Sequence, residues 1–248
     1  MKFRIIFILL FFSFTLANSL SKRGNEWMTG AGGSRVKFTT VGIITHNVPP
    51  NNTYFTGGNS NICDTNGNLI LTSNGYNIYD SNANLIDGGD TLVDTGLYNH
   101  YDGWSGYSQS SIFLPMESDK YYFVTPNYHN GNACYSCHFD VLSYSVIDMK
   151  ANGGAGKVVK RMIPFAENGQ FRKTQMMACR HGNGKDWWLL KQEGDSANVH
   201  IFLFTQDGVY DKGVQVFNEP VWGGWDIRGQ SVFNPIGNQY ASTSHSMG

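Results

Sequence analysis

The chain has 248 residues, a formal net charge of −1 and only 15% charged residues. The low charge argues against a disordered tail, and the lack of a basic excess argues against a nucleic-acid-binding protein. Gly (29 residues) and Asn (24 residues) are abundant, and aromatic residues make up 14%. Because Gly and Asn favour turns and aromatics favour half-buried strands, this composition disfavours helical bundles and doubly wound α/β folds.

The N-terminus has the order of an export signal. Met1 to Arg4 is a short basic segment, and an apolar run from Ile5 to Leu16 follows it. The run is too short to span a membrane, and the small residues that end at Ala17 offer a cleavage site. We therefore expect a signal peptide at 1–17, and one domain at 18–248 that is secreted or held at the cell surface. The alternative is a buried N-terminal strand. No later segment is apolar enough to span a bilayer.

Short apolar and aromatic runs then recur between clusters of Gly, Asn and Asp. Each run has about the length of a strand and is bounded by turn residues, whereas no 12-residue stretch shows convincing helical periodicity. These runs predict an all-β fold. The expected strands are 69–72, 76–79, 111–114, 121–125, 142–149, 186–190, 200–205 and 231–233.

One segment is repeated within the chain. Asp64 to Asn68 recurs 16 residues later as Asp80 to Asn84, an offset that suits a strand, a turn, a strand and a turn. Units of four short antiparallel strands give this rhythm, which favours a β-propeller; a β-sandwich has similar strand spacing and is the alternative. A calcium loop requires Gly where Leu69 and Leu85 stand, so we interpret both segments as turns.

Several segments, in order, carry a family resemblance. The most specific are Tyr144 to Met149 and Arg180 to Trp188, and Asp64 to Leu71, Gln109 to Pro115 and Asn152 to Val158 accompany them. Together they resemble the N-terminal β-propeller-like region of large secreted bacterial proteins. Those proteins commonly end in a gliding-motility or type IX secretion sorting domain. The resemblance covers about residues 60–245 and implies fold and export, but it transfers no catalytic residue.

The C-terminal segment from Gly229 to Ala241 resembles the opening strands of a further blade. No sorting domain follows it, so we expect an incomplete propeller ring cut from a longer protein; a short stand-alone version is the alternative. In an incomplete ring the two ends lie apart. Pairing of Val36 to Thr45 with Ser231 to Ala241 would instead close the ring.

The sharpest chemical motif is Cys134-Tyr135-Ser136-Cys137-His138, which matches the C-x-x-C-H attachment pattern of c-type haem. It lies in a Gly/Asn-rich loop without the helices that usually pack a haem. We expect a disulfide or two loop thiols and no cofactor; covalent haem on Cys134, Cys137 and His138 is the alternative. Zinc through His129 and the two cysteines lacks a clear fourth ligand. We interpret Cys63 and Cys179 as small buried residues.

The segment from Tyr98 to Tyr107 is an aromatic loop with few charges. Rigid aromatics among small polar residues form contact surfaces and stack on sugar rings, but they also pack inside long loops. The candidate ligand-binding residues are Tyr98, His100, Tyr101, Trp104 and Tyr107. His181, which precedes a Gly-Asn-Gly turn, is expected to be a turn or capping residue rather than a base.

These features predict a non-catalytic binding or scaffold module of a larger secreted or cell-surface protein. No nucleophile elbow, zinc-protease motif or phosphate-binding loop occurs in the sequence. The expected partner is an extracellular protein or a carbohydrate. The alternative is an exported haem electron carrier, or a propeller enzyme, centred on Cys134, Cys137 and His138.

Overall fold

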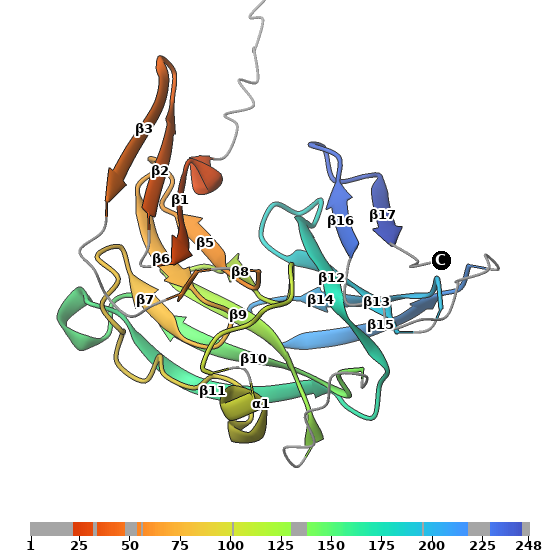
Figure 1. Ribbon diagram of the computed structural model, residues 1–248. Helices are drawn as coiled ribbons and strands as arrows, with labels where there is room; N and C mark the ends of the chain where they lie inside the picture. The colour runs from red at the N-terminus through yellow and green to blue at the C-terminus, as the bar shows by residue number, and fades with distance from the viewer. Residues whose placement is uncertain are drawn as a thin grey trace, which may run out of the picture.

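The computed structural model describes residues 22–31, 34–47, 54–55, 57–100, 102–129, 138–194, 196–217 and 229–244. In this part of the chain, strands account for 55% of residues and helices for 6%, so the predicted all-β class is confirmed. All pairs of named strands are antiparallel (Figure 1). No helix among the described residues is long and apolar enough to cross a membrane. The signal peptide predicted at 1–17 lies outside the described residues.

The strands form five sheets along the described chain, and each sheet except the first joins its strands in chain order. The first has the order β3-β2-β1-β4 and contains β1 (Glu26–Ala31), β2 (Ser34–Thr39), β3 (Gly42–Asn47) and β4 (Tyr54–Phe55). The second contains β5 (Ser60–Cys63), β6 (Leu69–Ser73) and β7 (Ile78–Asp80). The third contains β8 (Ile112–Pro115), β9 (Lys120–Asn127), β10 (Val141–Asp148) and β11 (Lys157–Ala166). The fourth contains β12 (Phe171–Arg180), β13 (Trp187–Glu193), β14 (Val199–Phe204) and β15 (Val209–Gln215), and the fifth contains β16 (Gly229–Phe233) and β17 (Tyr240–Ser244).

Three short helical segments accompany the sheets: η1 (Lys22–Gly24), α1 (Thr95–His100) and η3 (Asn152–Gly154). α1 lies inside the predicted aromatic loop. Asp94 starts it, because its carboxylate Oδ1 accepts the Gly96 amide at 2.7 Å and its carbonyl accepts the Tyr98 amide at 2.9 Å. A helix of six residues is too short to show helical periodicity in a 12-residue window.

Neighbouring sheets pack face to face through apolar side chains, because each sheet must bury a hydrophobic face. The first and second sheets share a core of Met28, Phe55, Cys63, Leu69, Tyr79 and Ala83. The second and third share a core that includes Leu71, Ile78, Phe113, Phe123 and Ile147. The third and fourth share the largest core, which includes Tyr122, Leu142, Met176, Leu189 and Phe204. β9 and β10 are buried on both faces, which explains their nearly continuous apolar sequences.

The repeated Asp-containing segments form turns with the same hydrogen bonds. Asp64 Oδ1 accepts the amides of Asn66 and Asn68 at 2.8 and 2.9 Å. Asp80 Oδ1 accepts the amides of Asn82 and Asn84 at the same two distances. The interpretation of both segments as turns is therefore confirmed, and the internal repeat is a structural one.

The predicted strand at 76–79 is wrong at its start, since β7 begins only at Ile78. The side chain of Asn74 accounts for the difference. Its Oδ1 accepts the amides of Tyr76 and Asn77 at 3.1 and 2.8 Å, so a local turn takes the hydrogen bonds that a strand would need.

The two ends of the described chain belong to different sheets. β2 and β3 pair with each other, and β16 pairs with β17. Among the described residues, no strand pairing joins Val36 to Thr45 with Ser231 to Ala241, so the hydrogen-bonded seam that would close a ring is not present there.

We predict that Asp80→Ala lowers the free energy of unfolding by about 1–2 kcal/mol, because two backbone amides lose their acceptor. Asp80→Asn keeps the Oδ1 acceptor and should cost clearly less. Urea denaturation measures both variants. Added calcium should leave the wild-type melting temperature unchanged, and a rise with calcium that disappears in Asp80→Ala would contradict the turn assignment.

Candidate functional site

The predicted aromatic loop continues after α1 as residues 102–110, which cross the junction between sheets. The Ser105 carbonyl accepts the amide of Gly58 at 2.9 Å, and the Ser105 amide donates to the Asn74 carbonyl at 3.0 Å. Asn74 Nδ2 also donates to the Gly103 carbonyl at 3.0 Å. These bonds attach the loop to the second sheet and satisfy backbone groups that are buried there.

Two glycines permit this close approach. A Cβ atom on Gly58 would lie 2.3 Å from Ser105 Cβ, and one on Gly75 would lie 2.5 Å from the same atom. Gly75 also has φ at +97°, a conformation that favours glycine. The loop therefore fits against the second sheet only because these positions lack side chains.

Gln109 attaches the other end of the loop to two further strands. Its carbonyl accepts the Met176 amide of β12 at 3.2 Å. Its side chain forms a reciprocal pair with Ser231 of β16, with Nε2 donating to the Ser231 carbonyl and Oε1 accepting the Ser231 amide, both at 2.8 Å. Gln109 has φ at 53°, a left-handed conformation that turns the side chain into this strand-like position.

The candidate ligand-binding aromatics fall into different environments. Tyr107 is only 5% exposed and packs edge-on against Phe139, with ring centroids 6.0 Å apart. Tyr98 is half-buried and packs near Tyr76. Trp104 is half-buried and lies beside Tyr54. The side chain of His100 and the whole of Tyr101 lie outside the described residues.

The pair formed by Trp104 and Tyr54 is the part of this loop that reaches the surface. Tyr54 is 49% exposed, and the two ring centroids are 6.4 Å apart at an interplanar angle of 36°. β1 places Tyr54 there, because Tyr54 pairs with Ala31 at the edge of the first sheet. The structure thus brings one predicted loop residue together with an aromatic residue that the sequence did not single out.

Under the loop, β12 contains an unusually large bulge. Phe171 pairs with Glu193 and Met176 pairs with Lys191, so the four residues 172–175 lie opposite Gln192 alone. All four are buried, and Gln175 adopts φ at 62°. Bulges of this kind redirect side chains and occur often beside functional sites.

Three buried cations surround the bulge. Lys173 Nζ donates to the Tyr107 hydroxyl at 3.0 Å and lies 4.8 Å from the centre of that ring. Arg172 donates to the Gly194 carbonyl at 2.9 Å and to Gln175 Oε1 at 3.2 Å. Lys191 Nζ, which is fully buried, donates to the Thr174 carbonyl at 2.7 Å. Through Tyr107 and Gln175, the cluster supports the loop above it.

Burial disfavours the charged form of a lysine. It lowers the pKa of Lys191 to about 7, and the nearby Arg172 charge acts in the same direction. Burial likewise lowers the pKa of Lys173 to about 8. Within the described ranges, no carboxylate lies at ion-pair distance from Lys191.

Gln175 extends the network to the last sheet. Its Nε2 donates to Ser242 Oγ at 2.7 Å and to the Thr243 carbonyl at 2.8 Å. Because Gln109 holds β16 and Gln175 holds β17, two left-handed glutamines attach this sheet to the rest of the molecule.

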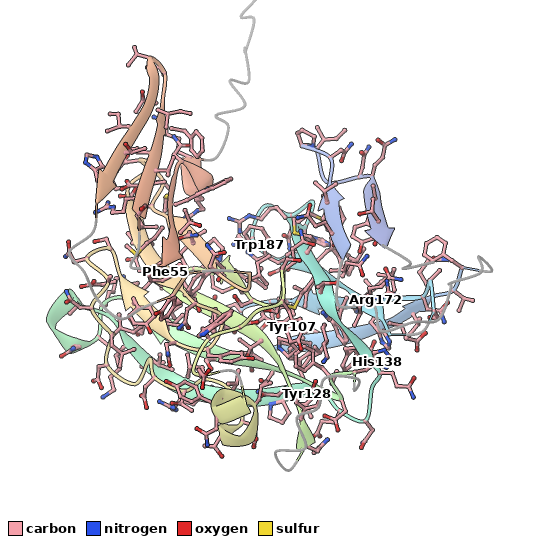
Figure 2. All side chains as sticks on the ribbon, in the orientation of Figure 1. Phe55, Tyr107, Tyr128, His138, Arg172 and Trp187 are labelled. Carbon is pink, nitrogen blue, oxygen red and sulfur yellow. The ribbon has the colours of Figure 1, made fainter. Side chains whose placement is uncertain are left out.

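His138 is half-buried beside the bulge, and Figure 2 places its label near that of Arg172. A Cβ on Gly194 would lie 2.4 Å from His138 Cδ2, so the imidazole lies directly on the Gly194 backbone. Cys134 and Cys137 lie outside the described residues, and the expectations of a disulfide or of covalent haem stay predictions. His129, considered as a zinc ligand, lies near two carboxylates, with Nε2 3.1 Å from Glu167 and Nδ1 3.5 Å from Asp140.

The remaining candidate residues have structural contacts. Cys63 and Cys179 are both buried free thiols, as predicted. His181 is confirmed as a turn residue, because its Nδ1 accepts the Asn183 amide at 3.1 Å and its ring packs on Trp188. In the described part of the chain, no group of three or more His, Cys, Asp or Glu side chains is arranged to hold a metal ion.

Sequence reasoning missed the basic cluster of Arg172, Lys173 and Lys191. Adjacent charged residues in a strand ordinarily indicate a solvated segment, and charged side chains are almost never fully buried unless paired. The available signal was the run Phe171 to Gln175 itself, in which charges and amides interrupt the alternation expected of a half-buried strand.

We predict that stability rises with pH because of Lys191. The folded state releases its proton at a pKa of about 7 rather than 10.5, so above pH 7 the unfolded state binds more protons. The free energy of unfolding should rise by up to about 1.4 kcal/mol per pH unit across this window. Lys173 adds a rise of the same sign above its pKa of about 8.

Lys191→Met should remove the Lys191 part of this slope and should be most stabilising near pH 7, where the wild type bears the cost of the buried charge. Urea denaturation at several pH values tests this, with Lys212→Met on the exposed strand β15 as the matched control. Parallel curves for wild type and Lys191→Met would contradict the prediction.

Comparison with known proteins adds no name to this site: no protein-family model, curated protein or solved structure matches the chain.

Proposed function

We propose that the chain is an exported, non-catalytic binding module, and that the Trp104–Tyr54 pair is its ligand contact. One observation carries the proposal. A surface pair of aromatic rings sits on a loop that hydrogen bonds attach to the second sheet, to β12 and to β16. Rigid aromatics offer a large contact area at a low entropic cost, and they stack on sugar rings.

The loop is already ordered before any ligand arrives. Ser105 Oγ and Ser110 Oγ lie 2.7 Å apart beneath it, and the Tyr107 hydroxyl accepts a hydrogen bond from Lys173. A loop fixed in this way loses little conformational freedom on binding, which favours recognition of a ligand by a preformed surface.

The proposed architecture is an incomplete, propeller-like arc of blades. The first strands of successive sheets contact one another in chain order: β1 with β5, β5 with β8, β8 with β12, and β12 with β16. Strands that open each blade and meet near a common centre are the arrangement of a β-propeller, which supports this interpretation over a sandwich of two sheets.

The proposed setting is a larger secreted or cell-surface protein, with an extracellular carbohydrate or protein as partner. The basic-apolar-small order of residues 1–17 supports export. The family resemblance of residues 60–245 to secreted bacterial proteins supports the same setting.

We predict that Trp104→Ala abolishes binding to whichever insoluble polysaccharide retains the wild type in pull-downs with cellulose, chitin and xylan. Loss of the stacking ring should weaken binding by about tenfold or more, since an aromatic contact contributes about 1–1.5 kcal/mol beyond its burial. Tyr210→Ala, which removes a 47% exposed aromatic from β15, is the control and should bind normally. Equal binding of the two variants, or release of reducing sugar, would contradict the proposal.

For export, we predict a mature N-terminus near Asn18. N-terminal sequencing of protein secreted from a bacterial host measures this directly. Secreted material that begins at Met1 would be inconsistent with a cleaved signal.

A further inference from the structure

The first sheet has two chemically different faces. Paired residues point to the same side, and the pairing joins Trp27 with Val36 and Phe38 with Ile43. The same ladder pairs Glu26 with Lys37 and Met28 with Arg35 on the opposite side. All the charged side chains of Glu26–Thr39 therefore lie on one face, and the other face carries Trp27, Thr29, Ser34, Val36, Phe38 and Ile43.

The charged face points into the protein. Glu26 is 2% exposed, its carboxylate accepts hydrogen bonds from the Arg35 guanidinium, and Lys37 Nζ lies 3.3 Å from it. Met28, on the same face, belongs to the core shared with the second sheet. The uncharged face points to solvent, with Trp27 50% and Ile43 65% exposed.

This orientation reverses the usual pattern, in which the solvated face of a sheet is the polar one. Loss of charged residues, together with enrichment in aromatics, marks the centre of protein–protein interfaces. Contiguous exposed apolar surface has the same meaning. The outer face of β1–β3 therefore has the composition of a surface that another protein covers.

The other end of the described chain offers a matching surface. On β16 and β17, Ser231 points inward to Gln109, whereas Val232 pairs with Ala241 on the outer side and is 56% exposed. The neighbouring outer pair, Gln230 with Thr243, is also uncharged. Figure 1 shows β1–β3 and β16–β17 on opposite sides of the molecule.

We propose that a second copy of this chain covers the outer face of β1–β3 with the outer face of its β16–β17 sheet. Every junction between neighbouring four-stranded or three-stranded sheets in the chain is an apolar face-to-face contact, and this docking continues that series from one copy to the next. The contact uses two different surfaces, so it is heterologous, and it extends to a ring or a chain of copies. It does not use the Trp104–Tyr54 pair and is independent of the ligand proposed above.

Sedimentation velocity of residues 18–248 over a range of concentrations tests the proposal. We expect the wild type to show a mass that increases with concentration beyond one chain. Ile43→Lys and Val232→Lys should each abolish the increase, because each places an unpaired charge in the same junction. Val159→Lys, on the 45% exposed Val159 of β11, is the control and should behave as wild type.

An equimolar mixture of Ile43→Lys and Val232→Lys should form a two-chain species, because one junction between intact faces is then possible. This recovery also shows that both variants are folded. A wild type that stays a single chain at all concentrations would overturn the proposal. Loss of association in Ile43→Lys but not in Val232→Lys would overturn the assigned partner surface, and so would a mixture that fails to associate.

Discussion

The need to pair buried backbone groups shapes the centre of this protein. Sheets that meet through their first strands leave the segment between β7 and β8 to cross the junction, where water cannot satisfy its amides and carbonyls. Ser105 meets this need toward the second sheet, and Gln109 meets it toward β12 and β16. Glycines at 58 and 75 make the approach sterically possible. The surface position of Trp104 follows from the way the rest of the loop is held.

The β12 bulge shows how a polar interior can support such a junction. An ordinary strand would present half of residues 172–175 to each neighbouring layer, whereas the bulge buries all four. Buried polar networks specify a structure strongly when their members are satisfied, because each lost partner is costly. Here the acceptors for the cations include the carbonyls of Thr174 and Gly194 and the phenol of Tyr107. The cost of three buried cations is thereby linked to one loop conformation.

Much of the fold could be predicted from the sequence, and the failures have physical causes. Strands with nearly continuous apolar sequence, such as β9 and β10, were found because both of their faces are buried. The turns at Asp64 and Asp80 were found because their chemistry is local. β11 and β12 were missed because lysines and arginines interrupt their patterns, and only tertiary packing decides whether such residues are exposed or buried.

The candidate site was predictable only as a region. Trp104 and Tyr107 have similar neighbours in the sequence, but one reaches the surface and the other is enclosed, and that difference depends on Lys173 and Phe139 far along the chain. The alternation in β1 and β2 is evident from the sequence as well. Which of the two faces turns inward depends on the second sheet, since a strand pattern alone does not say which side is covered.

The reciprocal hydrogen bonds between Gln109 and Ser231 also affect the order of assembly during synthesis. They join residues 122 positions apart, whereas the strands within most sheets follow one another directly along the chain. Local hairpins form before distant contacts, because closing a long loop costs more entropy. On the ribosome, the first four sheets are therefore complete while the central loop is still anchored on one side only. The emergence of β16 then completes its anchoring, so the last strands to be made finish the part of the molecule that the earlier ones surround.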